Sequence, residues 1–174
     1  MNSQTVRIRP LERSDLAAYR ALRLQALREQ PDAFSADVSE EEAMSDEAMA
    51  ARLAPPQPSV TFGAFSEDRL VGMAGFVASA RPKIRHKAAM VAVYVAPDQR
   101  GSGLGRQLVE QVIAHARQHR VILQCIVTAH NLTARNLYRQ LGFLPYGLER
   151  DAICVDGRYF DEELLALDLR SGQE

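Results

Sequence analysis

The chain has 174 residues, of which 47% are hydrophobic and 25% charged, and its formal net charge is -1. This composition is typical of a globular protein with enough chain for a hydrophobic core, so we expect a single domain over residues 1–174. The near-neutral charge excludes a generally basic surface for nucleic acid or acidic membranes, and no apolar run has the length of a membrane span or a signal-peptide core. Cys125 and Cys154 lie in apolar stretches and predict free thiols in a cytoplasmic protein rather than a zinc site.

The first half of the chain alternates between strand-like and helix-like hydrophobic patterns. In order, we expect a strand over 5–9, a helix beginning at Ser14 or Asp15, a second helix from Ser39 to about Leu53, and strands over 60–65 and 70–77. Ser39 and Glu42 have the spacing of a capping box at the start of the second helix. The proline-rich segment that follows would end that helix.

The second half continues the alternation with stronger signals. We expect strands over 88–95 and 121–127, helices over 103–119 and 131–141, and a final hairpin with strands over 152–155 and 159–169. The first two of these strands are apolar on both faces, which is typical of central strands. Because strand–helix–strand crossovers are right-handed, these two strands are predicted to lie parallel.

The turn after the first central strand carries the clearest chemical signal. Arg100 is followed by glycines at positions 101, 103 and 105, where a helix begins. A helix start leaves backbone N–H groups without helical partners, and together with the helix dipole they favour phosphate or pyrophosphate. The run has neither the Gly-Lys-Ser/Thr ending of a P-loop nor the glycine spacing of a dinucleotide fold. As Arg-x-x-Gly-x-Gly it resembles the acyl-CoA pyrophosphate loop of the GNAT superfamily of N-acetyltransferases, and an ordinary glycine-rich turn is the alternative.

A second motif lies one helix and one strand later. The segment from Asn131 to Phe143 is similar to the GNAT pattern Asn-x-x-Ala-x-x-Leu-Tyr-x-x-x-Gly-Phe, so the most specific resemblance spans Val93 to Phe143. The resemblance implies an α/β fold (α+β in some schemes), in which a mixed, mostly antiparallel sheet of about six or seven strands has one parallel pair and about four flanking helices. It also implies an enzyme that transfers an acetyl group from acetyl-CoA to a primary amine by direct attack through a tetrahedral intermediate.

In GNAT proteins the two central strands separate, and acetyl-CoA lies between them. The resemblance implies that backbone groups of Val93 and Val95 pair with the pantetheine arm, as an added strand would. Asn131 would reach the same arm, although its alternative role is only that of a helix N-cap. No metal is expected. The pyrophosphate would be bound by the run of Arg100, Gly101, Ser102, Gly103, Leu104, Gly105 and Arg106, where glycine allows the backbone to approach the ligand.

Tyr138 is the expected general acid for the departing thiolate. A phenol titrates near pH 10 and a thiol at about 8.5, so the phenol keeps a proton to donate at neutral pH. The resemblance also implies that the N–H of Val95 stabilises the oxyanion of the tetrahedral intermediate. The alternative for Tyr138 is a packing role on the apolar face of its helix.

The general base is not evident from the sequence. Many GNAT enzymes carry a glutamate on the strand before the pyrophosphate loop, whereas the strand over 88–95 has no carboxylate. Glu149 and Asp161 are candidate catalytic replacements, and Glu163 and His86 are further candidates. Asp161 and Glu163 share a strand face with two leucines, which favours an inward orientation. A solvated position for each carboxylate, or a base acting through water, is the alternative.

The acceptor is expected to be a small-molecule or peptidyl amine, with no nucleic-acid or membrane partner, and a homodimer is compatible with the sequence. Six acidic residues and no basic one lie between Asp37 and Glu47, which favours either a cationic acceptor or a solvated helix face. Arg23 falls on the apolar arc of the first helix, where it would meet a substrate carboxylate or form a salt bridge. Two alternatives stay open: a catalytically weak module that binds acyl-CoA as a sensor, and transfer of a larger acyl group.

Overall fold

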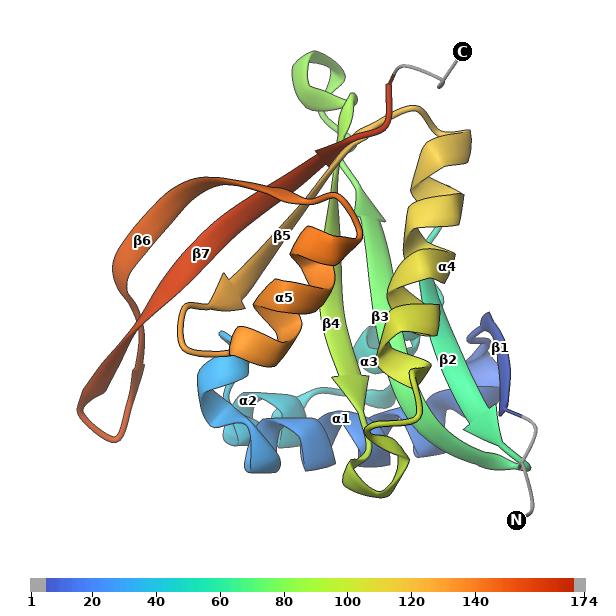
Figure 1. Cartoon of the computed structure of the whole chain (residues 1–174). Coiled ribbons are helices and arrows are strands. Elements are labelled where there is room, and N and C mark those ends of the chain that lie inside the picture. Colours follow the sequence, from blue (N-terminus) through green and yellow to red (C-terminus); the bar gives the residue numbers. More distant parts are fainter. Residues whose placement is uncertain (1–5, 171–174) are drawn as a thin grey trace.

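The structure is a computed structural model that describes residues 6–170. Seven strands form one sheet in the order β1-β2-β3-β4-β5-β7-β6 (Figure 1). The strands are β1 (Val6–Pro10), β2 (Val60–Ser66), β3 (Arg69–Ala78), β4 (Lys87–Val95), β5 (Ile122–Thr128), β6 (Leu144–Val155) and β7 (Arg158–Asp168). The helices are α1 (Leu16–Glu29), α2 (Val38–Ala43), α3 (Asp46–Leu53), α4 (Leu104–Gln118) and α5 (Leu132–Gln140). Among these strands only β4 and β5 pair in parallel, which confirms the predicted fold class.

The first strand and the first helix follow the prediction closely. Thr5, the predicted start of the first strand, lies outside the described residues. The first helix begins directly after Asp15, as expected, but the Asp15 side chain does not cap it. The Asp15 carboxylate instead accepts hydrogen bonds from Arg9, at 2.7 and 2.8 Å, and from the N–H of Glu12. This carboxylate therefore ties β1 to the turn that precedes α1.

The predicted helix from Ser39 to Leu53 is wrong, because the chain forms two helices there, α2 and α3. The capping box that begins α2 consists of Asp37 and Glu40, rather than Ser39 and Glu42. A second cap, Ser45, begins α3 by accepting a hydrogen bond from a backbone N–H of its first turn. Asp37 and Ser45 each cap the start of a helix, and a cap residue has non-helical backbone angles. The second cap therefore divides the segment into two helices.

The two central strands separate after a short paired stretch. The parallel register joins Lys87–Ala89 only to Ile122–Gln124. Beyond it, β4 stays paired with β3 as far as Val95, and β5 stays paired with β7. The β3–β4 register shifts opposite Ala92, which has a positive φ of 54°, so β4 carries a bulge at this point. The C-terminal ends of β4 and β5 therefore diverge (Figure 1).

Helices cover both faces of the sheet. On one face lie α4 and α5, and Phe76 of β3 packs edge-on against His115 of α4. On the other face, Val77 of β3 and Arg23 of α1 line one cavity. Within residues 6–170 no helix is long and apolar enough to cross a membrane. The predicted apolar stripe of α4 is confirmed, and its buried members include Leu104, Leu108, Val112 and Ala116.

The C-terminal hairpin is longer than predicted. The turn at Asp156-Gly157 is where the sequence indicates it, but β6 begins at Leu144 rather than Ala152. Two register shifts interrupt the pairing of β6 with β7. The strand Leu144–Val155 is largely exposed, so its hydrophobic alternation is weak. The hairpin places carboxylates of β6 and β7 beside the open end of the central pair.

Candidate active site

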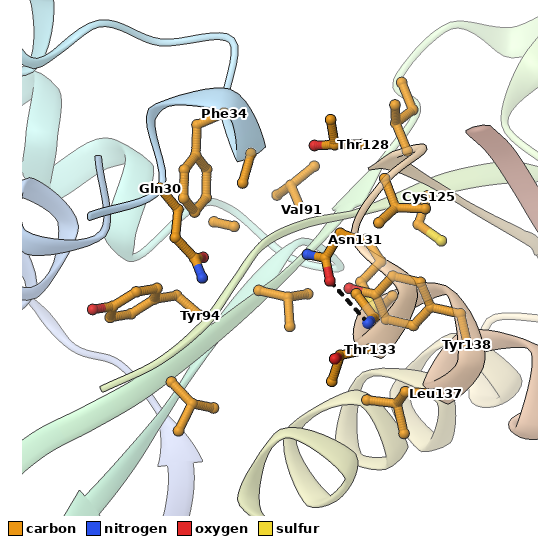
Figure 2. A pocket seen from close by; sticks show the side chains of 18 of the residues that line it. Gln30, Phe34, Val91, Tyr94, Cys125, Thr128, Asn131, Thr133, Leu137 and Tyr138 are labelled. Atoms are coloured by element: carbon orange, nitrogen blue, oxygen red, sulfur yellow. Dashed lines mark hydrogen bonds between the residues drawn. The ribbon is translucent and has the colours of Figure 1, made fainter. Parts of the chain in front are cut away.

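A cavity of about 400 Å³ occupies the opening between β4 and β5. Residues 90–95 of β4, residues 125–128 of β5 and the inner face of α5 line it. Gln30 and Phe34, which follow α1, form the opposite wall (Figure 2), and Ala33 also lines the cavity. Figure 2 shows Tyr138 and Asn131 on the α5 side and Phe34 and Tyr94 across the cavity. The two expected motifs thus meet at one opening, although residues 93 and 138 are far apart in the chain.

The glycine turn leads from β4 into α4. Gly101 and Gly103 have positive φ values of 76° and 83°, and an added Cβ at either would meet no atom within 4 Å. Gly103 is the N-cap of α4, and its carbonyl accepts the first helical hydrogen bond, from Gln107. The helix start therefore presents backbone N–H groups that have no helical partner. The Ser102 hydroxyl donates to the carbonyl of Gln99 and stabilises this turn.

The Arg100 side chain bends back from the turn toward β4. Its Nε donates to the carbonyl of Val95 at 2.9 Å, and Nη2 lies 3.3 Å from a carboxylate oxygen of Glu29. The guanidinium also lies over the ring of Tyr94, whose hydroxyl donates to Glu29 at 2.5 Å. Arg100 thereby lines the cavity and contacts the strand end that is expected to pair with the pantetheine arm.

Three of the other expected cofactor contacts, Val93, Val95 and Asn131, line the same opening, whereas residues 101–106 are not part of its lining. Val93 and Val95 line the cavity just beyond the bulge of β4. The Arg106 side chain crosses from α4 to α5, where it donates to Gln140 at 2.6 Å. Asn131 lines the cavity, and its Oδ1 accepts from the N–H of Ala134 at 3.1 Å, as a helix N-cap does (Figure 2). The Asn131 side-chain oxygen is thus occupied in starting α5, which leaves its amide nitrogen as the donor available toward the cavity.

Tyr138 lies on the inner face of α5 and lines the cavity beside Cys125 of β5 (Figure 2). The residue is only 6% exposed. Burial and the nearby Cys125 thiol raise the pKa of Tyr138 well above its ordinary value. Burial, together with the charge of Glu163, raises the pKa of Cys125 to about 12. Both groups therefore keep their protons at neutral pH, and the phenol is able to donate one.

A second cavity of about 720 Å³ lies on the face of the sheet that α1 covers. It shares Phe34, Val91 and Cys125 with the first cavity, so the two meet at the open end of β4. Its polar lining includes Arg23, Arg52 and Glu162. A group in this cavity would approach the opening from the side opposite α5.

Adjacent carboxylates of β7 point to opposite faces of the sheet. Glu163 faces α5 and binds Arg135, at 2.9 and 3.0 Å, and Arg139, at 2.6 Å. These arginines lower the pKa of Glu163. Glu162 faces the second cavity and pairs in register with Glu149 of β6. Burial and the neighbouring Glu149 charge raise the pKa of Glu162.

The remaining base candidates lie at different places. Asp161 accepts hydrogen bonds from Arg150 at 2.9 Å and from the N–H of Asp151 at 3.0 Å. His86 lies at the paired end of the central strands, where its carbonyl accepts from the N–H of Ile122. Sequence reasoning did not single out Glu162, although the strict alternation of a strand places it on the face opposite its two acidic neighbours.

Among the described residues, 6–170, no group of three or more His, Cys, Asp or Glu side chains has the arrangement of a metal site. The functional groups of the two connected cavities and of the adjoining glycine turn are backbone amides, a buried phenol, a carboxylate with a raised pKa and arginines. Such a set suits acyl transfer, since it offers donors for an anionic ligand, a proton donor and a proton acceptor on opposite sides of one opening.

Comparisons with known proteins agree with this geometry. The model of the acetyltransferase (GNAT) family matches residues 22–143. The chain is similar to an acetyltransferase of the GNAT family from Streptococcus pneumoniae, with 25% identity, a TM-score of 0.84 and coverage of 94% of this chain and 99% of that one. Its fold is similar to that of yncA from Salmonella typhimurium, solved with its cofactor acetyl-CoA, with 21% identity, a TM-score of 0.84 and coverage of 98% and 97%.

A curated relative matches a shorter part of the chain. It is the L-methionine sulfoximine/L-methionine sulfone acetyltransferase of Pseudomonas paraeruginosa, with 35% identity over 78 residues. This match covers 44% of the chain and 45% of that relative, so it spans less than half of either protein.

Proposed function

Because the chain belongs to the acetyltransferase (GNAT) family, we propose that it transfers an acetyl group from acetyl-CoA to a primary amine of a small molecule or peptide. The observation that carries the proposal is the opening between β4 and β5, which α5 also lines. Arg100, at the start of the glycine turn, and the buried Tyr138 both line this opening. The acetyl-CoA present in the structurally similar yncA supports the choice of cofactor.

The backbone of this opening would bind the cofactor. The amides of residues 100–106 would hold the pyrophosphate at the start of α4, where the helix dipole favours a negative charge. The backbone of Val93 and Val95 would pair with the pantetheine arm, and the Asn131 amide nitrogen would donate to the same arm. Because the Arg100 guanidinium now donates to the Val95 carbonyl, we expect it to turn toward the pyrophosphate when the arm pairs there.

The chemistry follows from these positions. The neutral amine attacks the thioester carbonyl, forming the new C–N bond and a tetrahedral oxyanion that the Val95 N–H would stabilise. The C–S bond then breaks, and Tyr138 gives its proton to the departing sulfur. The raised pKa of Tyr138 keeps that proton available across the working pH range.

A carboxylate would accept the proton that the amine loses. Glu162 is the residue we favour, because it lines the second cavity and its pKa is raised. Glu149, its cross-strand neighbour, would act by keeping that pKa high. Asp161, bound to Arg150 and to a backbone N–H, would hold β6 and β7 together at this point.

The test is turnover of acetyl-CoA by the purified protein with a panel of primary amines. We expect thiol release that depends on the amine, together with a product whose mass has increased by one acetyl group. Propionyl-CoA in a parallel reaction would report the acyl-chain preference. Tight binding of acetyl-CoA without transfer to any amine would refute the proposal and favour a sensor module.

A further inference from the structure

We propose that the second cavity selects an acceptor that carries a carboxylate as well as the amine, and that Arg23 binds this carboxylate. The substrate class is thus an amino acid or a similar zwitterion. This inference rests on the proposed acetyl transfer and names the acceptor of that same site. It starts from the 720 Å³ cavity that meets the cofactor opening at Phe34, Val91 and Cys125.

Arg23 lies in the wall of this cavity without a full set of partners. It is on α1 and 8% exposed, and its guanidinium lies 5.0 Å from the centre of the Phe34 ring. Its Nε is a buried nitrogen with no hydrogen-bond partner among the described residues. A buried charged donor left in this state is costly unless something binds it. An anion in the cavity would provide the missing acceptor.

The charges around Arg23 do not balance. Glu41, 1% exposed, accepts two hydrogen bonds from Arg52, at 2.6 and 2.8 Å. The same carboxylate lies 3.5 Å from Arg23 Nε. Two guanidinium groups therefore share one carboxylate, and both arginines line the cavity. The cluster has one surplus positive charge, which matches a monoanion such as a carboxylate better than a phosphate dianion.

A second charged group of the cavity suits the amine. Glu162 lines the same cavity as Arg23, so the cavity presents a cation and a carboxylate to one ligand. The remaining lining is mainly apolar and includes Val77, Ala89 and Val91. A molecule with an anionic end, an amine and an apolar body fits this distribution. The amine end would lie nearest the opening that both cavities share.

The acidic segment does not provide the surface that a polycation requires. Five of its six carboxylates already bind partners within the chain. Asp37 and Glu40 cap α2, Glu41 binds Arg52, Glu42 binds Arg28, and Asp46 binds Arg20. The structure therefore favours a small zwitterion over a polyamine in the second cavity.

The experiment compares each of a set of L-amino acids with its own carboxamide, which keeps the amine and removes the negative charge. We expect kcat/KM to favour at least one free acid over its carboxamide by about 30-fold. In Arg23→Gln this ratio should fall to about 1, and in Arg23→Lys it should be intermediate, since the charge is kept. Arg28→Gln, which alters an exposed arginine of the same helix, should keep the wild-type ratio. The ratio is independent of the amount of folded enzyme.

The outcomes separate this inference from the proposed function. Transfer to amines with equal rates for acids and carboxamides would leave acetyl transfer standing and overturn the carboxylate site. The carboxylate site would also be overturned, with acetyl transfer still standing, if Arg23→Gln kept the preference for free acids over carboxamides. If no amine were acetylated, calorimetry with the CoA-bound protein would decide. If the protein bound a free acid but not its carboxamide, and Arg23→Gln lost this binding, the carboxylate site would be supported although acetyl transfer had failed. Equal binding of acid and carboxamide, or no binding of either, would overturn the carboxylate site.

Discussion

The opening between β4 and β5 has two sides that are built from different parts of the chain. The side facing α5, which we assign to the cofactor, is formed by residues from two short segments, 93–100 and 131–138, and the glycine turn continues from the first of them. It offers mainly backbone groups and one buried phenol. The side facing α1, which we assign to the acceptor, gathers single side chains such as Arg23, Arg52 and Glu162 from distant elements.

The difference concerns what each side recognises. A diphosphate and an extended pantetheine arm are common to every acyl-CoA, and backbone N–H groups at a helix start bind them without a particular side chain. An acceptor differs from enzyme to enzyme, so its recognition depends on charged and apolar side chains. We therefore expect substitutions on the two sides to separate cleanly in their kinetic effects.

The largest effect is expected on the side facing α5. Tyr138→Phe should lower kcat about 10³-fold, because the thiolate would leave without a proton donor. The affinity for acetyl-CoA should change little, since the ring still fills the space beside Cys125. Stopped-flow or steady-state thiol release gives kcat, and calorimetry gives the dissociation constant. Equal losses of kcat and affinity would mean that Tyr138 holds the cofactor rather than acting as an acid.

The next largest effect tests the acceptor side. Glu162→Gln should lower kcat about 100-fold near neutral pH, less than the loss of the acid because water is able to accept the amine proton. In the wild type, kcat should fall as pH drops through the pKa of Glu162, since the base works only when deprotonated. Because that pKa is raised, the fall should lie above the ordinary value of 4.5.

Matched variants sharpen this result. Glu149→Gln should move the fall in kcat to lower pH, since the neighbouring charge that raises the pKa of Glu162 is removed. Glu163→Gln changes the adjacent glutamate on the other face of the sheet. This variant should leave the pH at which kcat falls unchanged. If kcat of Glu162→Gln still fell with pH as it does in the wild type, a group other than Glu162 would be the base.

A third substitution tests the cofactor side alone. Gly103→Val should weaken CoA binding about 30-fold, or about 2 kcal/mol, because a β-branched residue strains a turn that requires positive φ and obstructs the approach to the amides. The matched control is Gly157→Val, which has a similar φ of 75° in the hairpin turn. This control should lose stability but keep its CoA affinity in calorimetry. A Gly103→Val protein that binds CoA as the wild type does would remove the turn from the pyrophosphate site.

The same contrast explains which parts of the structure could be predicted from the sequence. The stripe of α4 and the glycine turn depend on neighbouring residues, so local patterns indicate them. The strand beginning at Leu144 escaped prediction because it is mostly exposed, includes Pro145 and a positive-φ Asp151, and shifts register twice. The division between α2 and α3 depended on which of several acidic and hydroxyl side chains cap the helices.

The acceptor side escaped prediction for a different physical reason. Arg23 is visible in the sequence as an anomaly on an apolar arc, but its shared carboxylate, Glu41, becomes its neighbour only when α1 packs beside α2 and α3. Glu162 acquires its raised pKa from a cross-strand partner and from burial. The separation of β4 from β5 depends on a bulge at Ala92 that no local pattern indicates.

The smallest effect is expected at Glu163, a carboxylate that lines neither cavity. Glu163→Gln should lower the free energy of unfolding by about 1.5 kcal/mol at pH 7, because charge-assisted hydrogen bonds to Arg135 and Arg139 are lost. Since those arginines lower the folded-state pKa of Glu163, its stabilisation is complete above the unfolded pKa, near 4.3, and disappears as the pH falls through the folded value. Denaturant titrations of both proteins at several pH values should therefore converge in acid. A difference that persists there would mean that the loss comes from packing rather than from the ion pairs.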